Sequence, residues 1–304
     1  ELFAGAWYLD EIKAYHAENI QTTRGKKELV HELKKCACDL FIQLPDDLAS
    51  WRTLVRNALF AKLIGARAAY GFVVRTVQIF KKAQVDYTEQ ETEAESLMKI
   101  LRKNGISGGK IEFDFPITPI HQKNIEKILR EAWGSNYKKH TLIAMSVGGK
   151  REGNQWPIER FASVARYCEE KYNAKIIILG GKEDSMKAEH ITPRLKKENI
   201  LIAAGKINLL ETIELLKHCT FLIANSTGTI HMAAAVGTPI IGLYGIRDVF
   251  GRWFPYGAQH TVLAHKLLKC NYRDESCIAK SIKMIFEDEV KTACDAMVAK
   301  YKKI

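Results

Sequence analysis

The residues best suited to chemistry in this chain follow one short apolar stretch. Directly after residues 221–224 comes the run Asn-Ser-Thr-Gly-Thr-Ile-His at 225–231, followed by small residues typical of a helix. The first N–H groups of a helix have no intrahelical partner, and with the helix dipole they attract anions. Gly228 would let the backbone approach a phosphate, while Ser226, Thr227, Thr229 and His231 would donate hydrogen bonds. These residues alone leave a second interpretation equally open, a Ser/Thr helix cap beside a buried histidine.

Two further loops carry residues suited to a nucleotide. The loop at 148–157 contains Gly149, Lys150 and Arg151 after an apolar stretch, which would suit a diphosphate. It has neither the P-loop spacing nor the GxGxxG pattern of dinucleotide-binding folds. In the loop at 180–184, Glu183 would accept hydrogen bonds from ribose hydroxyls, or would be the acidic first turn of a helix. Within the first loop, Trp156 is better explained as a packing anchor than as a base stacker.

The elements that must position these loops are clearest in the second half of the chain. Apolar stretches alternate there with helical patterns, which is typical of a parallel sheet covered by helices on both faces. Ligands bind such sheets beyond the carboxyl ends of the strands, so the three loops are expected at one edge. An aromatic loop at 253–257 would wall a sugar pocket or pack into the core. The predicted strands are residues 141–147, 175–180, 200–203, 220–224 and 239–244.

The first half is less regular and suggests a separate domain. Two prolines, Pro116 and Pro119, interrupt any helical period and mark the linker. The sequence therefore predicts an N-terminal domain at 1–118, a nucleotide-binding domain at 119–286, and a final helix at 287–304 that packs back on the N-terminal domain. The expected elements of the first half are helices at 26–36, 50–63 and 91–104 and short strands at 39–44 and 65–72.

Composition and charge narrow the class of protein. Apolar residues make up 47% of the 304 residues, and no apolar run approaches the length that spans a bilayer. The seven cysteines lack framework or zinc spacing, so a reducing compartment, the cytoplasm, fits best. Cys168, Cys219 and Cys294 fall in helical patterns and are expected to be small core residues. Residues 1–118 carry 17 Lys+Arg against 16 Asp+Glu, and residues 119–304 carry 29 against 19. The basic second half is compatible with a phosphorylated ligand or with peripheral contact with an anionic membrane. Aromatic residues are not interleaved with the basic ones, so we expect no nucleic-acid partner.

The order of these motifs resembles glycosyltransferase family 9, which contains the ADP-heptose:lipopolysaccharide heptosyltransferases. The resemblance covers most of the chain and is most specific in the second half. It is carried by Trp156-Pro157-x-x-Arg160-Phe161, by Leu179-Gly180-Gly181-x-Glu183, and by residues 225–239 from the Asn-Ser-Thr-Gly turn to Gly-Thr-Pro.

The resemblance implies an α/β protein of the GT-B fold, with two Rossmann-like domains facing a cleft. It also implies inverting, metal-independent transfer from a nucleotide-diphospho-sugar, here ADP-heptose, to a glycolipid or oligosaccharide acceptor, with no cofactor. Carried over by position, Gly149 and Lys150 would lie near the diphosphate, Glu183 at the ribose and Ile207 beside the base. Together with Ser226 and Thr229 of the same turn, residues Thr227, Gly228 and His231 would hold the phosphates.

Three departures from the family pattern bear on activity. The chain starts later than a typical member, so the N-terminal domain is expected to lack the first strand and the Gly-Asp turn that carries the presumed catalytic base. From the chain as given, the sequence predicts nucleotide binding with little or no transfer. Asn154 stands where members commonly have Lys, and Ser226 where they have Asp. Another sugar donor, or a non-catalytic nucleotide- or glycan-binding module, therefore stays open as an alternative.

Overall fold

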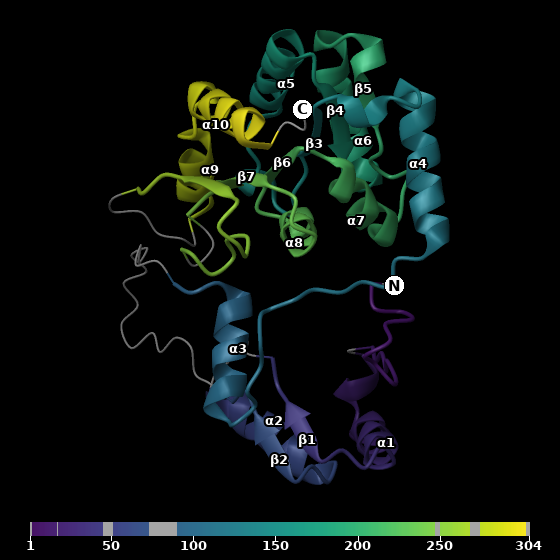
Figure 1. Ribbon diagram of the computed structural model, residues 1–304. Helices are drawn as coiled ribbons and strands as arrows, with labels where there is room; N and C mark the ends of the chain where they lie inside the picture. Colours follow the sequence, from purple (N-terminus) through teal and green to yellow (C-terminus); the bar gives the residue numbers. More distant parts are fainter. Residues whose placement is uncertain are drawn as a thin grey trace. The chain divides into compact units, whose positions relative to one another are not determined.

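The computed structural model describes residues 2–16, 18–44, 51–72, 90–246, 250–267 and 274–301 (Figure 1). The chain divides into two compact units, and each is described by itself. The larger unit comprises Glu1–Trp7, Ala83–Thr92 and Glu112–Ile304, and the smaller unit comprises Tyr8–Lys82 and Glu93–Ile111. The main boundary thus falls at 111/112, a few residues before the predicted one at 118/119.

The larger unit is built on a parallel six-stranded sheet in the order β5-β4-β3-β6-β7-β8. Within this sheet, β3 forms first at the centre, and β4 and β5 follow toward one edge. The chain then returns to the centre with β6 and continues with β7 and β8 toward the other edge. This is the Rossmann strand order. Its topological switch point lies between β3 and β6, where the connections on the two sides lead in opposite directions. The five predicted strands are confirmed, and β8 is an additional one. The bounds are β3 (Leu142–Ser146), β4 (Lys175–Leu179), β5 (Ile200–Ile202), β6 (Phe221–Asn225), β7 (Ile240–Tyr244) and β8 (Thr261–Ala264).

Helices cover both faces of this sheet because alternate strand residues point to opposite faces. On β3, Ile143 and Met145 join one core with side chains of α5, α9 and α10, whereas Leu142 and Ala144 join a second core with α4, α7 and α8. The bounds are α4 (Pro119–Trp133), α5 (Ile158–Tyr172), α6 (Lys182–Ile191), α7 (Leu209–His218), α8 (Gly228–Ala235), α9 (Glu275–Lys283) and α10 (Glu287–Tyr301). Single 3-10 turns lie at Tyr137–Lys139, Glu152–Asn154, Thr192–Arg194 and Lys197–Asn199.

The last helix belongs to the larger unit and is not a segment of its own. In α10, Val290 and Cys294 are fully buried in the core shared with α5. At the same contact Asp295 accepts hydrogen bonds from the hydroxyls of Tyr167 and Tyr172 of α5. The amphipathic pattern of residues 287–301 is therefore satisfied by α5 and the sheet beside it.

The smaller unit pairs two short parallel strands, β1 (Leu40–Ile42) and β2 (Ala68–Tyr70). Its helices are α1 (Thr23–Lys34), α2 (Trp51–Leu63) and α3 (Glu93–Lys103), which confirms the predicted helices to within a few residues, and a 3-10 turn lies at Asn19–Gln21. Gly71 follows β2 with a φ of +89°, and a Cβ there would overlap the carbonyl oxygen of Gln43. Only glycine tolerates both the positive φ and the close approach of the Gln43 carbonyl oxygen.

Two expectations from composition can be compared with the structure. Among the described residues, no helix combines the length and the apolar character needed to cross a bilayer. The predicted core positions of Cys168, Cys219 and Cys294 are confirmed, since all three are buried free thiols. Cys277 is disulfide-bonded, which its spacing does not predict.

Candidate functional site at the carboxyl edge of the sheet

Asn225, the last residue of β6, joins the two loops at the switch point. Its side chain is fully buried. Its Nδ2 donates to the carbonyl oxygens of Val147 at 3.0 Å and Gly148 at 3.1 Å, and its Oδ1 accepts from the backbone N–H of Trp156 at 2.9 Å. All three partners belong to the loop after β3, so one side chain holds both ends of that loop beside the start of α8.

The start of α8 has a hydroxyl that the fold does not use. Thr227 occupies the N-cap position with φ −142° and ψ 169°, but its side chain makes no capping hydrogen bond. Its Oγ1 is buried and has no hydrogen-bond partner among the described residues. Buried hydroxyls are nearly always paired, and an unpaired one destabilises the fold. This oxygen is therefore suited to a ligand group bound at the helix start.

The other residues of this turn differ in exposure. Gly228 is exposed, and a Cβ there would meet open space, so a ligand could approach its N–H. Thr229 is buried, and its Oγ1 is 3.2 Å from Ser146 Oγ of β3. His231 is exposed, with its ring 6.0 Å from that of Trp253. The helix-cap interpretation is thus wrong on both counts, because the threonine does not cap and the histidine is not buried.

The loop after β3 presents one lysine to solvent and pairs its neighbour. Lys150 is exposed and, among the described residues, makes no ion pair, whereas the Arg151 guanidinium lies 3.6 Å from the Glu275 carboxylate. Of the two cations that the sequence offers for a diphosphate, Lys150 is therefore the better placed to meet one. Gly149 is half-buried, and its carbonyl oxygen accepts from Gln155 Nε2 at 2.7 Å.

A buried carboxylate that the sequence analysis missed lies between this loop and the next. Asp184 of α6 accepts from the N–H of Gly181 at 3.0 Å and from Lys187 Nζ at 3.2 Å. A Cβ at either Gly148 or Gly180 would overlap this carboxylate, so both strand ends require glycine. In the sequence, only the glycines that follow β3 and β4 hint at this carboxylate. The structure shows that these glycines leave the space that it occupies.

The same lysine continues the network to the first loop. Lys187 Nζ also donates to Gln155 Oε1 at 3.0 Å, and Gln155 in turn holds the carbonyl of Gly149. Side chains from α6 therefore fix the loop after β3 from one side while Asn225 fixes it from the other. Of the remaining predicted residues, Glu183 is exposed in the first turn of α6, and Ile207 is half-buried just before α7.

The aromatic residues near this edge are mainly structural. Trp156 is buried, its Nε1 donates to the carbonyl of Ile285 at 2.8 Å, and its ring meets that of Phe161 edge-on at 5.0 Å. The predicted packing role of Trp156 is confirmed. Tyr244, the last residue of β7, is buried, its ring meets that of Phe254 in the following loop, and its hydroxyl donates to the carbonyl of Trp253.

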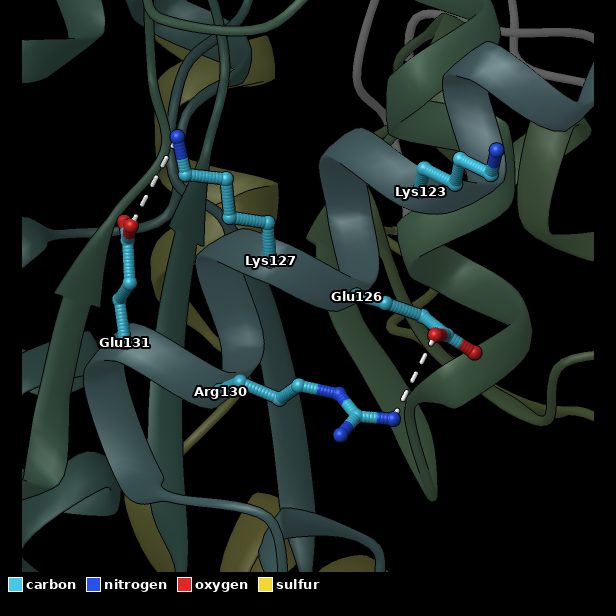
Figure 2. A pocket seen from close by; sticks show the side chains of 5 residues that line it. All are labelled: Lys123, Glu126, Lys127, Arg130 and Glu131. Atoms are coloured by element: carbon cyan, nitrogen blue, oxygen red, sulfur yellow. Dashed lines mark ion pairs between the residues drawn. The ribbon is translucent and has the colours of Figure 1, made fainter.

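A pocket of about 360 Å³ on the outer side of α4 is not part of this edge. Figure 2 shows Lys127 turned toward Glu131 and Arg130 turned toward Glu126, at 3.8 and 3.6 Å. None of the predicted site residues lines this pocket, and its charges are largely paired with one another. It is a surface depression along one helix, lined by Lys123, Glu126, Lys127, Arg130 and Glu131.

The model of glycosyltransferase family 9 (heptosyltransferase) matches residues 27–283. The chain belongs to glycosyltransferase family 9. It is 34% identical over 94 residues to lipooligosaccharide heptosyltransferase 2 of Haemophilus influenzae, a match of 30% of this chain and 27% of the relative. The chain thus matches about a quarter of the length of its curated relative.

Solved structures extend the likeness to the whole fold. A family 9 glycosyltransferase from Veillonella parvula aligns with a TM-score of 0.76 and 20% identity, covering 98% of this chain and 85% of that one. The ADP-heptose lipopolysaccharide heptosyltransferase II of Escherichia coli aligns with a TM-score of 0.63 and 17% identity, covering 91% and 82%. These likenesses confirm the α/β fold of the GT-B class predicted from the sequence.

Proposed function

We propose that the larger unit binds a nucleotide-diphospho-sugar at the carboxyl edge of its sheet, and that the protein transfers the sugar from this donor to a glycan. The observation that carries the proposal is the buried hydroxyl of Thr227 at the start of α8, which has no partner among the described residues. A helix start with free N–H groups and a hydroxyl lacking a partner suits a phosphate oxygen. The E. coli relative is named an ADP-heptose transferase, so ADP-heptose is the donor to test first.

The roles proposed for single residues are those that the family resemblance implies. The backbone at Gly228, with Ser226, Thr227, Thr229 and His231, would hold the phosphates at the start of α8. Gly149 and Lys150 would meet the diphosphate from the loop after β3, where Lys150 is exposed and makes no ion pair among the described residues. Glu183 would accept from the ribose hydroxyls, and the backbone at Ile207 would lie beside the base.

The chemistry proposed is an inverting transfer that needs no metal. An acceptor hydroxyl loses its proton to a general base and attacks the anomeric carbon on the face opposite the diphosphate, which leaves. Donors from Lys150, His231 and the start of α8 stabilise the developing negative charge, and each such donor is typically worth a few kcal/mol in the transition state. The acceptor, a lipopolysaccharide core or a similar glycan, would bind to the smaller unit. A cytoplasmic location stays a prediction.

Titration calorimetry with ADP-heptose tests the donor site through Thr227→Val. Removing an unpaired buried hydroxyl should leave the free energy of unfolding unchanged or slightly higher, while donor affinity falls roughly tenfold, about 1.4 kcal/mol. Thr238→Val is the matched control, because the Thr238 hydroxyl is buried but already donates to the carbonyl of Leu216 at 2.8 Å. That variant should lose stability and keep its affinity. Unchanged donor affinity in Thr227→Val, or no binding of any nucleotide sugar, would contradict the proposal.

A second candidate is a transferase with a different sugar donor. Ser226 supplies a hydroxyl where the family pattern has a carboxylate, so the contacts to the sugar differ. Thermal-shift measurements with ADP-, UDP- and GDP-sugars distinguish the candidates, because a true donor stabilises the folded state by mass action. Donor binding without transfer to any glycan would instead favour a non-catalytic binding module.

A further inference from the structure

Trp253 differs from the aromatic residue beside it in the loop after β7. Phe254 packs against the core, with its ring 4.8 Å from that of Tyr244. Among the described residues, Trp253 joins neither core of the larger unit, and it is 37% exposed. Its ring meets that of His231 edge-on at 6.0 Å, and its indole N–H donates no hydrogen bond within the described part of the chain. Packing therefore explains Phe254 but leaves the ring and the N–H of Trp253 available to a ligand.

The backbone that carries Trp253 is held from two sides. The hydroxyl of Tyr244, the last residue of β7, donates to the Trp253 carbonyl at 2.8 Å. Earlier in the loop, the carbonyl of Phe250 accepts from the N–H of Gln90 at 2.9 Å, and a Cβ at Gly251 would overlap the Gln90 backbone. The indole is therefore presented at the end of β7 by a fixed loop, which lowers the cost of ordering it around a ligand.

The proposed donor site crosses the sheet in the order of its strands. Ile207 follows β5, Glu183 follows β4, and Thr227 follows β6 at the switch point. Strand β7 lies on the side of β6 away from β4 and β5, and neighbouring strands are about 4.8 Å apart. A donor with its base at β5, its ribose at β4 and its diphosphate at the switch point would therefore extend its sugar toward the end of β7. That is where Trp253 lies.

We propose that Trp253 packs against the transferred sugar of the donor and is a specificity-determining residue of this site. The inference rests on the proposed function and adds to it the residue that contacts the sugar. The C–H bonds on one face of a sugar ring carry a partial positive charge and pack against the negative face of an aromatic ring. The indole N–H would donate to a hydroxyl of the same sugar. A sugar bonded to the phosphate beside His231 is within reach of a ring that already contacts His231.

Other roles fit Trp253 less well. A structural tryptophan looks different in this chain, since Trp156 is 1% exposed and its Nε1 donates to the carbonyl of Ile285 at 2.8 Å. Trp253 has neither this burial nor, among the described residues, a partner for its N–H. Stacking on the nucleotide base would place the base at the end of β7, on the far side of the switch point from Glu183 and Ile207.

Titration calorimetry with ADP and with ADP-heptose tests the role of Trp253. In Trp253→Leu the affinity for ADP-heptose should fall roughly tenfold, because the sugar loses the aromatic face, while the affinity for ADP changes by less than about twofold. Trp253→Phe keeps an aromatic ring and removes the N–H, so it should bind ADP-heptose within about threefold of the wild type. Because the side chain is partly exposed and outside both cores, thermal unfolding of both variants should match the wild type.

The matched control is Trp51→Leu, since Trp51 is 65% exposed and lies on α2 of the smaller unit. This variant should bind both ligands like the wild type. An equal loss of affinity for ADP and ADP-heptose in Trp253→Leu would show that Trp253 only orients His231, and would overturn the inference. Unchanged affinity for both ligands, or a wild type that binds ADP but not ADP-heptose, would also overturn it. Failure of the donor site itself is distinguishable, because the wild type would then bind neither ligand.

Discussion

The larger unit covers both faces of six strands with helices, whereas the smaller unit builds on two paired strands and leaves much of its apolar surface open. In the larger unit, strand residues such as Ile143 and Leu222 are completely buried. In the smaller unit, Leu44 and Trp51 are each at least 65% exposed. The two units therefore differ in how much of their apolar surface is packed.

In the larger unit, buried polar contacts hold the loops at the carboxyl edge of the sheet. Asn225 and Lys187 fix the loop after β3 from two directions. A site for a diphosphate needs such fixed donors, since their value depends on being oriented before the ligand arrives. The smaller unit has no comparable buried polar network among its described residues and offers an exposed helix face instead.

The largest effect is expected from Asn225→Ala. The substitution leaves two buried carbonyls and one N–H of the loop after β3 without partners, so the free energy of unfolding should fall by about 3–5 kcal/mol. ADP-heptose affinity should fall with it, as measured by urea unfolding and calorimetry. Ser226→Ala, at the next and half-buried position, is the comparison and should change stability by no more than about 1 kcal/mol. A loss below about 1 kcal/mol in Asn225→Ala would show that the loop is held in another way.

Gly71→Ala should be the most damaging small change in the smaller unit. The added Cβ would overlap the carbonyl oxygen of Gln43, and alanine would have to adopt the φ of +89° that only glycine tolerates readily, so we expect the free energy of unfolding to fall by about 3 kcal/mol or more. Gly65→Ala is matched to it, since Gly65 has φ +90° but a Cβ added there would have no atom within 4 Å. That change should lose only about 1–2 kcal/mol. Hydrogen exchange should show faster opening of the smaller unit alone, and an equal effect in both variants would exclude the overlap as the cause.

The smallest effect is a loss of stability in acid that is confined to the larger unit. Burial lowers the pKa of His218 below its ordinary value, more than the nearby Glu214 raises it. The unfolded chain therefore takes up a proton first, so this contribution is complete above the unfolded pKa of about 6.5 and is lost as pH falls through the folded pKa. His218→Gln should flatten the decline in unfolding free energy between neutral and acidic pH. His31→Gln, on the exposed side of α1, should leave the decline as it is.

Much of this architecture could be predicted from the chain itself. The continuous apolar runs of the second half predict the parallel strands, because a strand buried on both faces has no polar positions. The glycines and small polar residues after those runs predict ligand loops at one edge, since parallel strands end on the same side. Strand β8 was not predicted, although it is no shorter and no less buried than β5 at the opposite edge, which was.

The sequence does not show which polar groups meet and which remain without partners, because these contacts depend on how the chain packs. Sequence spacing cannot show that Asn225 reaches three groups near residues 147–156, or that the carboxylate of Asp184 occupies the space beside Gly148 and Gly180, because these residues are far apart along the chain. The sequence leaves open whether the hydroxyl of Thr227 caps the helix or binds a ligand, and only the geometry shows that it makes no capping hydrogen bond. Likewise, the period of α2 predicts two faces, but only packing determines which of them is left open.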